Sequence, residues 1–156
     1  PISDCPGHFV ERRIDDMTAR EYLSELQLMK AKIGQLQERR QMYLDKATSI
    51  TAALNPVKVQ SSPVADRMGD NVARAADIDT RIDKELCSFW DKQDEVTKQI
   101  QGLHNVKYMQ LLFKVYIQEK SIRQAAREMK MSYGYVMQLH KQALEAFEGM
   151  YADVLY

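Results

Sequence analysis

Basic side chains gather in one part of the chain, and their chemistry suits negatively charged oxygens. Residues 107–141 carry seven Lys or Arg against two acidic residues, Glu119 and Glu128. Residues 17–103 are balanced, with 13 basic and 13 acidic side chains. Because the whole chain has 22 of each sign, only this local excess gives it a region that attracts a phosphate backbone. The basic residues of this region are Lys107, Lys114, Lys120, Arg123, Arg127, Lys130 and Lys141.

Catalytic and metal-binding patterns do not occur in this sequence. Its three histidines, His8, His104 and His140, are scattered, and it has no phosphate-cradling glycine loop or nucleophile motif. Cys5-x-x-His8 has the spacing of half a metal site, yet no second Cys or His pair completes it. We therefore expect no enzymatic activity, no cofactor and no bound metal. For His140 we expect solvent exposure or a phosphate contact instead of catalysis.

Three short helices are predicted after Gly102. We place them at residues 104–118, 121–129 and 132–148. Gly149 has the residue type that stops a helix. Residues 104–149 are therefore expected to form a small domain, and residues 150–156 a C-terminal tail. The apolar residues expected in its core are Met109, Leu112, Phe113, Tyr116, Ile122, Ala125, Ala126, Met129, Val136, Leu139, Ala143, Leu144 and Phe147.

The second and third of these helices have the features of a helix-turn-helix. Ser121 and Ser132 stand where N-caps are needed, because their hydroxyls can accept the unpaired N–H groups of the following turn. The small side chains of Ala125 and Ala126 allow two helices to approach closely. The short turn MKMS carries two methionines that can anchor both helices. These features indicate a helix-turn-helix, although other three-helix domains share them.

Two long helices are predicted between residues 17 and 103. Thr18 and Glu21 have the spacing of a capping box at the start of the first. Its apolar stripe steps by four and three through Tyr22, Leu26, Met29, Ile33, Leu36, Arg40, Tyr43, Ala47 and Ile50. The second stripe runs through Met68, Val72, Ala75, Asp79, Ile82, Leu86, Phe89, Gln93, Val96, Ile100 and Leu103. Since the prolines and serines of NPVKVQSSP make a short loop between them, we expect an antiparallel helical hairpin of coiled-coil type.

Some apolar residues fall outside these stripes, such as Leu23, Leu28, Ile78 and Trp90. A two-helix rod buries one face of each helix, so its stability calls for further packing. These side chains either contact a partner or second copy, or pack on the C-terminal domain, and the sequence leaves both open. We expect the hairpin to mediate oligomerisation or partner docking, and residues 1–16 to be a tail.

The segment SIRQAAREMKMSYGYVMQLHKQALEAF, residues 121–147, resembles the region-four helix-turn-helix of sigma-70-family factors. It matches that unit in its small, apolar and turn positions, in the Val-x-Gln-Leu step from Val136 to Leu139, and in its closing Ala-Leu pair. With MTAREYL, KVQSSP and the long hairpin, residues 17–148 resemble a family of uncharacterised phage and prophage proteins of Gram-positive bacteria. That family is related to late-gene transcriptional activators of the RinA and ArpU type.

The resemblance implies binding to double-stranded DNA near promoters, with the last helix of the motif in the major groove. Gln138 suits an adenine edge, which its amide can pair bidentately. Lys141 and the other cations suit phosphates, helped by N–H groups near Ser121. With the apolar positions inward, Tyr133, Gly134 and Met137 face outward beside them. The full candidate DNA-binding set is Lys120, Ser121, Arg123, Lys130, Ser132, Tyr133, Gly134, Met137, Gln138 and Lys141.

The exposed positions depart from the sigma pattern. Tyr133 and Gly134 stand where region four usually carries Arg and Glu, Met137 where it carries another Arg, and Lys130 where it has a glycine. These changes remove the side chains that commonly recognise guanine, so a different DNA sequence is expected. Exposed Tyr and Met also suit a protein interface. The alternatives are a non-catalytic adaptor or inhibitor of a host machine such as RNA polymerase, and a phage DNA-packaging subunit.

Composition agrees with an all-α protein. The 156 residues include six Gly and four Pro, too few for a turn-rich β architecture. Two distant cysteines suggest neither a disulfide framework nor a zinc site. No apolar run approaches the roughly 20 residues that span a bilayer. We expect a transcription regulator in the cytoplasm of a bacterial host cell, without membrane attachment.

Overall fold

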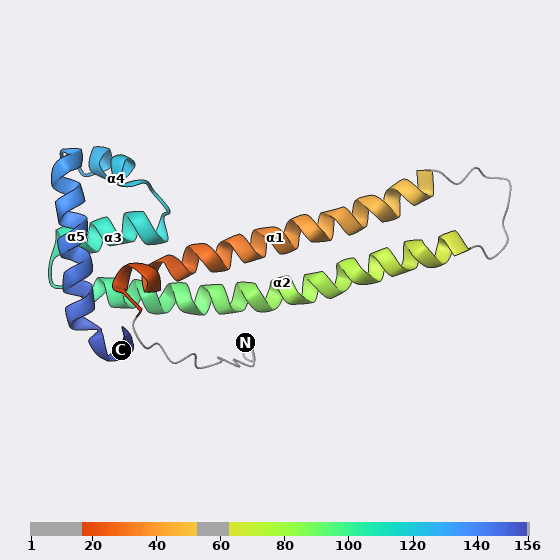
Figure 1. Cartoon of the computed structure of the whole chain (residues 1–156), viewed down its shortest axis with the longest axis horizontal. Helices are drawn as coiled ribbons and strands as arrows, with labels where there is room; N and C mark the ends of the chain where they lie inside the picture. Colours follow the sequence, from red (N-terminus) through yellow and green to blue (C-terminus); the bar gives the residue numbers. More distant parts are fainter. Residues whose placement is uncertain (1–16, 53–62, 156) are drawn as a thin grey trace. The chain divides into compact units, whose positions relative to one another are not determined.

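The described part of the chain is built of helices joined by short turns. The computed structural model describes residues 17–52 and 63–155, and no strand occurs in these ranges. The expected all-α class is therefore confirmed. The elements are α1 (Ala19–Ala52), α2 (Pro63–Gln101), α3 (Val106–Leu112), a π-helical segment η1 (Phe113–Ile117), α4 (Ile122–Glu128), α5 (Tyr133–Met150) and α6 (Ala152–Leu155), as Figure 1 shows. The expected tail at residues 1–16, the Cys5-x-x-His8 motif and most of the expected loop lie outside the described residues.

The two long helices pack against each other, as the stripes predicted. The capping box at the start of α1 is present: the Thr18 N–H donates to Glu21 Oε2 at 3.0 Å, and the Glu21 N–H donates to Thr18 Oγ1 at 3.3 Å. Pro63 is the first residue of α2, where its missing N–H costs no helical hydrogen bond. None of the described helices is long and apolar enough to cross a membrane.

The described residues form two compact units: residues 17–29 with 88–155, and residues 30–52 with 63–87. These boundaries differ from the expected division at residue 103. The start of α1 and the end of α2 belong to the same unit as the C-terminal helices. Buried residues of the two apolar stripes occur in both units.

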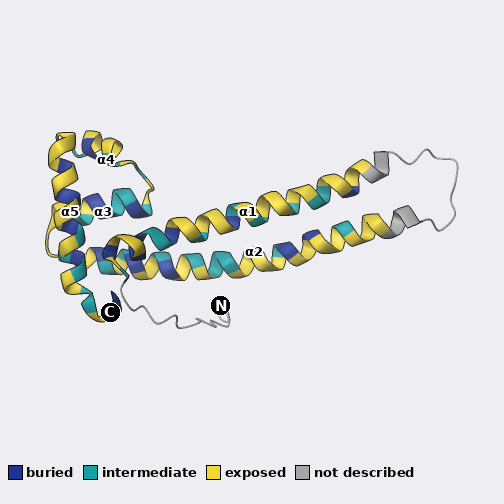
Figure 2. Ribbon diagram, in the orientation of Figure 1, coloured by how far each residue is buried: buried dark blue, intermediate teal, exposed yellow. Residues whose placement is uncertain are grey.

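The unit of residues 30–87 is held by a narrow apolar seam. Its buried side chains are Ile33, Ala47, Ala75, Ile78 and Ile82. Two polar members of the stripes form an ion pair in this unit, where Arg40 Nε lies 2.5 Å from Asp79 Oδ1. Met68 and Val72 were expected in the seam but are 37% and 47% exposed. Figure 2 shows how burial is confined to one side of each arm.

The other unit has a wider core at the hairpin base. One cluster joins both long helices to the later ones through Ala19, Tyr22, Leu23, Leu26, Val96, Ile100, Leu103, Leu112, Tyr116, Ala143, Phe147 and Leu155. Leu23 thus packs against the C-terminal helices, which is one of the two outcomes expected for the off-stripe apolar residues. Leu28 and Trp90, by contrast, are 64% and 60% exposed.

A second, smaller cluster holds the helix-turn-helix together. It consists of Leu111, Ala125, Ala126, Val136 and Leu139, with contributions from α3, α4 and α5. Because Leu111 belongs to this cluster and its neighbour Leu112 to the larger one, α3 connects the two. The small side chains of Ala125 and Ala126 are buried, as the sequence predicted for a close helix crossing.

The first C-terminal helix differs from the expected span 104–118. It begins at Val106, because the Asn105 side chain accepts the N–H groups of Lys107 and Tyr108. It then widens into η1, where the Gln118 N–H donates to the Phe113 carbonyl at 3.0 Å. This hydrogen bond joins residues five apart and marks the end of η1, before α4 begins at Ile122.

The C-terminal end also differs from the expected stop and tail. Gly149 does not end α5, since it has no positive φ and the helix continues to Met150. The following residues form α6, and Leu155 is fully buried in the larger cluster. The Tyr151 hydroxyl donates to the Gln99 carbonyl at 2.8 Å and so fastens this end to α2.

His140 is buried, which corrects the expectation of an exposed or phosphate-binding histidine. Its Nε2 lies 3.1 Å from the Tyr116 hydroxyl, and the two rings stack with centroids 5.8 Å apart. Burial lowers the pKa of His140, assisted by the charge of Arg20, and burial raises the pKa of Tyr116. Both shifts favour a hydrogen bond between neutral partners.

Gly102→Ala is expected to lower the free energy of unfolding by about 1–2 kcal/mol, since a Cβ at residue 102 would collide with the Tyr151 hydroxyl and disturb its hydrogen bond. Gly149→Ala is the matched control. A Cβ there meets nothing within 4 Å, so it should leave stability unchanged or raise it by up to about 1 kcal/mol. Urea unfolding of both variants measures the difference, and equal stabilities would contradict this packing.

His140 is expected to make stability depend on pH. Its folded pKa lies below the unfolded value of 6.5, so the folded state excludes a proton that the unfolded state binds. Stability contributed by neutral His140 is present above pH 6.5 and is lost as pH falls through the folded pKa. Urea unfolding between pH 7.5 and 5 should show this loss, and His140→Gln should reduce it. His104→Gln, at an exposed residue, should keep the wild-type slope; identical slopes in all three proteins would refute the assignment.

Candidate nucleic-acid interface

The outward face of α5 carries the predicted contact residues. Tyr133, Gly134, Met137, Gln138 and Lys141 are all exposed. Those expected inward, Val136, Leu139, Ala143 and Phe147, are all buried. The predicted helical phase is therefore confirmed, while the role of the exposed residues in DNA binding stays a prediction.

The two serines of the candidate set are helix caps. Ser121 Oγ accepts the Gln124 N–H at 3.2 Å, and the Gln124 side chain accepts the Ser121 N–H at 3.1 Å. Ser132 Oγ accepts the Tyr135 N–H at 3.3 Å. Because the N–H groups of Ser121 and Gln124 are already bonded, this helix start has fewer free donors for a phosphate than the sequence suggested. The serines position the interface by starting α4 and α5.

The ammonium group of Lys120 forms an ion pair with a carboxylate of the same chain. Its Nζ lies 2.6 Å from Glu128 Oε1, and Lys114 Nζ lies 2.6 Å from Glu128 Oε2. These two hydrogen-bonded cations lower the pKa of the Glu128 carboxyl. Lys120 therefore connects the segment before α4 to the end of that helix, and the structure does not leave its ammonium free as the sequence suggested. The pairing of Glu128 with these two lysines was not predicted from the sequence.

Two cations lie over exposed tyrosine rings beside this face. The guanidinium of Arg123 is 5.6 Å from the Tyr133 ring centroid, and Lys107 Nζ is 5.8 Å from that of Tyr135. Tyr135 is exposed and was absent from the candidate set. Two features of the sequence could have indicated Tyr135. It lies two residues after Tyr133 in the first turn of the same helix, and basic Lys107 belongs to the same region. The pairs place positive charge next to flat aromatic surface.

Lys130 occupies a left-handed backbone position in the turn between α4 and α5. Its φ is 55°, which is the conformation that favours glycine. The Met131 N–H donates to the Ala126 carbonyl at 2.9 Å and completes the turn. The exposed Lys130 side chain is thus held at the entrance to α5 by a strained backbone.

Gly134 leaves open space in the first turn of α5. A Cβ built there meets no atom within 4 Å, so packing within the described residues does not require glycine. Tyr133 is 49% and Met137 44% exposed, so large side chains border this gap. The result is a shallow flat spot between tyrosines and a methionine.

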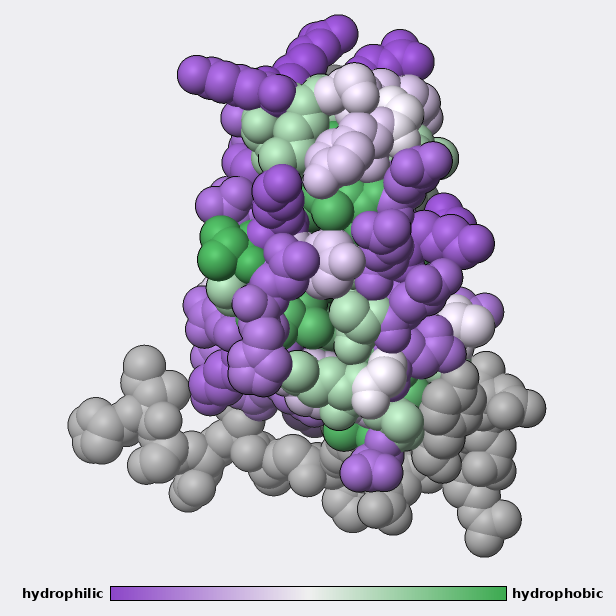
Figure 3. Space-filling view, turned by 90° about the vertical axis from the view of Figure 1, so that its left-hand side faces the viewer, coloured by the Kyte–Doolittle hydropathy of each residue, from purple (hydrophilic) through white to green (hydrophobic). Residues whose placement is uncertain are grey.

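The surface therefore combines apolar contact area with positive charge. Figure 3 looks onto the side of the molecule where α5 lies, and shows hydrophobic and weakly polar residues in a band bordered by hydrophilic ones. Gln138 adds an amide that can donate and accept at once. Nowhere in residues 17–52 and 63–155 do three or more His, Cys, Asp or Glu side chains gather in a way that could hold a metal. The chemistry available is hydrogen bonding, ion pairing and apolar contact.

Comparison with known proteins places the chain in a family. No curated protein and no solved structure matches it. A family model described as "Protein of unknown function (DUF1492)" matches residues 51–148, which include α2 and the helix-turn-helix and make up more than half of the chain. The chain therefore belongs to the DUF1492 family of proteins of unknown function.

Proposed function

We propose that the protein binds double-stranded DNA through α4 and α5 and acts as a transcription regulator of a phage or prophage. The observation that carries this proposal is the outward face of α5, where Gln138 and Lys141 are exposed one and two turns after the flat spot at Gly134. An α-helix about 10–12 Å across fits the major groove, which is about 12 Å wide. In this arrangement α5 enters the groove, and the turn at Lys130 meets the backbone.

The charges near α5 support phosphate binding of modest strength. Arg123, Lys130 and Lys141 are exposed, whereas Lys120 is paired with Glu128. Three phosphate contacts give a slope of about −3 in log affinity against log salt concentration. Such a slope corresponds to weak binding by one domain, and a second copy would strengthen it.

The sequence that is read should differ from a sigma-type promoter element. Tyr133 and Met137 offer apolar contact to a thymine methyl group, and Gln138 offers a bidentate pair to adenine. A/T-rich recognition follows from these side chains. The proposed link to phage regulation rests on the resemblance of residues 17–148 to a family of phage and prophage proteins.

The hairpin has a separate proposed role in oligomerisation or partner docking. Its exposed Leu28, Val72 and Trp90 provide apolar contact area on the surface of the arms. The same reasoning supports a second candidate function. Exposed Tyr133, Tyr135 and Met137 are residue types favoured at protein interfaces, so α5 could instead hold a protein such as RNA polymerase, as an adaptor or inhibitor.

Two substitutions on α5 should have different effects on DNA binding. Gln138→Ala is expected to lower discrimination at one base pair by about 1–3 kcal/mol. Lys141→Ala should weaken binding to all sequences alike and reduce the salt slope by about one. Duplexes selected from a random pool, titrated by fluorescence anisotropy at two salt concentrations, measure both effects. Lys98→Ala, at an exposed lysine of α2, is the matched control.

Salt-independent binding, or no selected duplex, would overturn DNA binding. Co-purification of a host protein in the absence of DNA, lost on Tyr133→Ala, would instead favour the adaptor.

Lys130→Gly should separate stability from binding. Glycine relieves the left-handed strain, so the free energy of unfolding is expected to rise by about 1 kcal/mol. The lost cation should weaken duplex binding and reduce the salt slope by about one. Lys130→Ala removes the same charge without relieving the strain and should weaken binding with no gain in stability. A Lys130→Gly protein that binds duplex as tightly as wild type would exclude Lys130 from the interface.

A further inference from the structure

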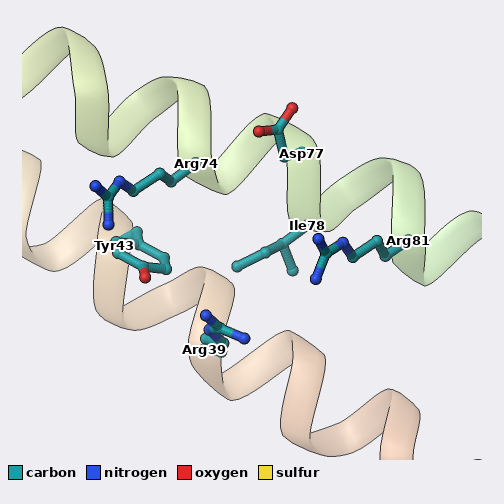
Figure 4. Close-up of a pocket in the computed structure, with 6 residues that line it drawn as sticks. All are labelled: Arg39, Tyr43, Arg74, Asp77, Ile78 and Arg81. Atoms are coloured by element: carbon teal, nitrogen blue, oxygen red, sulfur yellow. The ribbon is translucent and has the colours of Figure 1, made fainter.

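A hollow between the two arms of the hairpin gathers arginine side chains. It lies within the unit of residues 30–87 and has a volume of about 160 Å³. Since one water needs on the order of 10–15 Å³ of such space, the hollow has room for an anion of several non-hydrogen atoms. Its lining residues are Arg39, Tyr43, Arg74, Asp77, Ile78 and Arg81, all labelled in Figure 4.

The arginines that line the hollow come from both arms. Arg39 lies on α1, and Arg74 and Arg81 on α2; Figure 4 shows Arg74 beside Tyr43, Arg81 beside Ile78, and Arg39 on the opposite arm. The Arg74 guanidinium is 5.8 Å from the Tyr43 ring centroid. Hydrogen bonds from Arg39 and then Arg74 lower the pKa of the Tyr43 hydroxyl. The hydroxyl and the guanidinium groups thus share one small volume.

The positive charge of the hollow is only partly offset by a carboxylate. Within the described residues, Arg39, Arg74 and Arg81 make no ion pair, whereas neighbouring Arg40 is paired with Asp79. Asp77, the one acidic lining residue, projects away from Tyr43 in Figure 4. Three arginines against one aspartate leave the lining with a charge of +2. Like charges held together in this way are stabilised by a bound anion.

We propose that this hollow is a binding site for a phosphate group, carried by a phosphate ester or polyphosphate. A guanidinium presents two parallel N–H donors that match two phosphate oxygens, and the three arginines supply several such forks. The Tyr43 hydroxyl adds a donor on one side, and Ile78 provides an apolar floor. Lys46, whose Nζ is 5.5 Å from the Tyr43 ring centroid, adds a further positive charge near this phenol. The site is formed by residues other than those proposed to bind DNA.

Calorimetric titration of the full chain with pyrophosphate tests the site. Saturable binding is expected in excess of the heat given by sodium chloride at equal ionic strength. Arg39→Gln and Arg74→Gln should each raise Kd about tenfold, because each removes one charge-assisted pair. The matched control is Arg67→Gln, which removes an exposed arginine of α2 that does not line the hollow. Circular dichroism shows whether each variant remains helical.

Heat no greater than that of chloride, or equal Kd values for wild type, Arg39→Gln and Arg74→Gln, would overturn the proposal. The source of the phosphate is distinguished by a DNA duplex arm. Weaker duplex binding by both variants, with competition from pyrophosphate, supports the site and identifies a nucleic-acid backbone. Unchanged duplex binding together with weaker pyrophosphate binding supports the site and identifies a free phosphate compound.

Discussion

The buried stripe of α5 is the constraint on which the candidate interface depends. Val136 and Leu139 pack in the small cluster of the helix-turn-helix, and Ala143 and Phe147 in the larger cluster at the hairpin base. Because α5 contributes side chains to both clusters, each cluster fixes which face of the helix points inward. The exposed face follows from this orientation, and so does the place of Gln138. A change that turned α5 would have to disrupt both clusters.

Charge pairing then decides which cations remain available. Glu128 binds Lys114 and Lys120, and in the larger core Lys92 lies 3.4 Å from Glu25 Oε2 and 3.9 Å from the Tyr22 ring centroid. These lysines hold elements of the fold together. A simple count of basic residues therefore overestimates the charge that can meet a phosphate. The arginines around Tyr43 are the opposite case, because the fold gathers them without pairing them.

Periodicity was sufficient to predict the long helices, most of their seam and the phase of α5, because each of these depends on residues three or four apart. Features that depend on distant residues were not predictable in this way. His140 is buried against Tyr116, 24 residues away, and Lys120 is paired with Glu128 on the far end of α4. Leu155 looked like part of a tail, since no local pattern indicates that the core needs it. The Arg74 contribution to the hollow is likewise invisible until the arms are paired.

Lys130 and Gly134 each carry a local cost in stability. Lys130 adopts a left-handed φ that glycine would adopt without strain, and Gly134 lies in a helix where alanine would be more stable. Exchanging these residue types would favour folding at both positions, and no contact among the described residues requires either choice. Sequences that act against local stability in this way are typical of functional surfaces. Here the two positions flank the start of α5, so both costs fall at the part of the helix that the proposed function assigns to DNA.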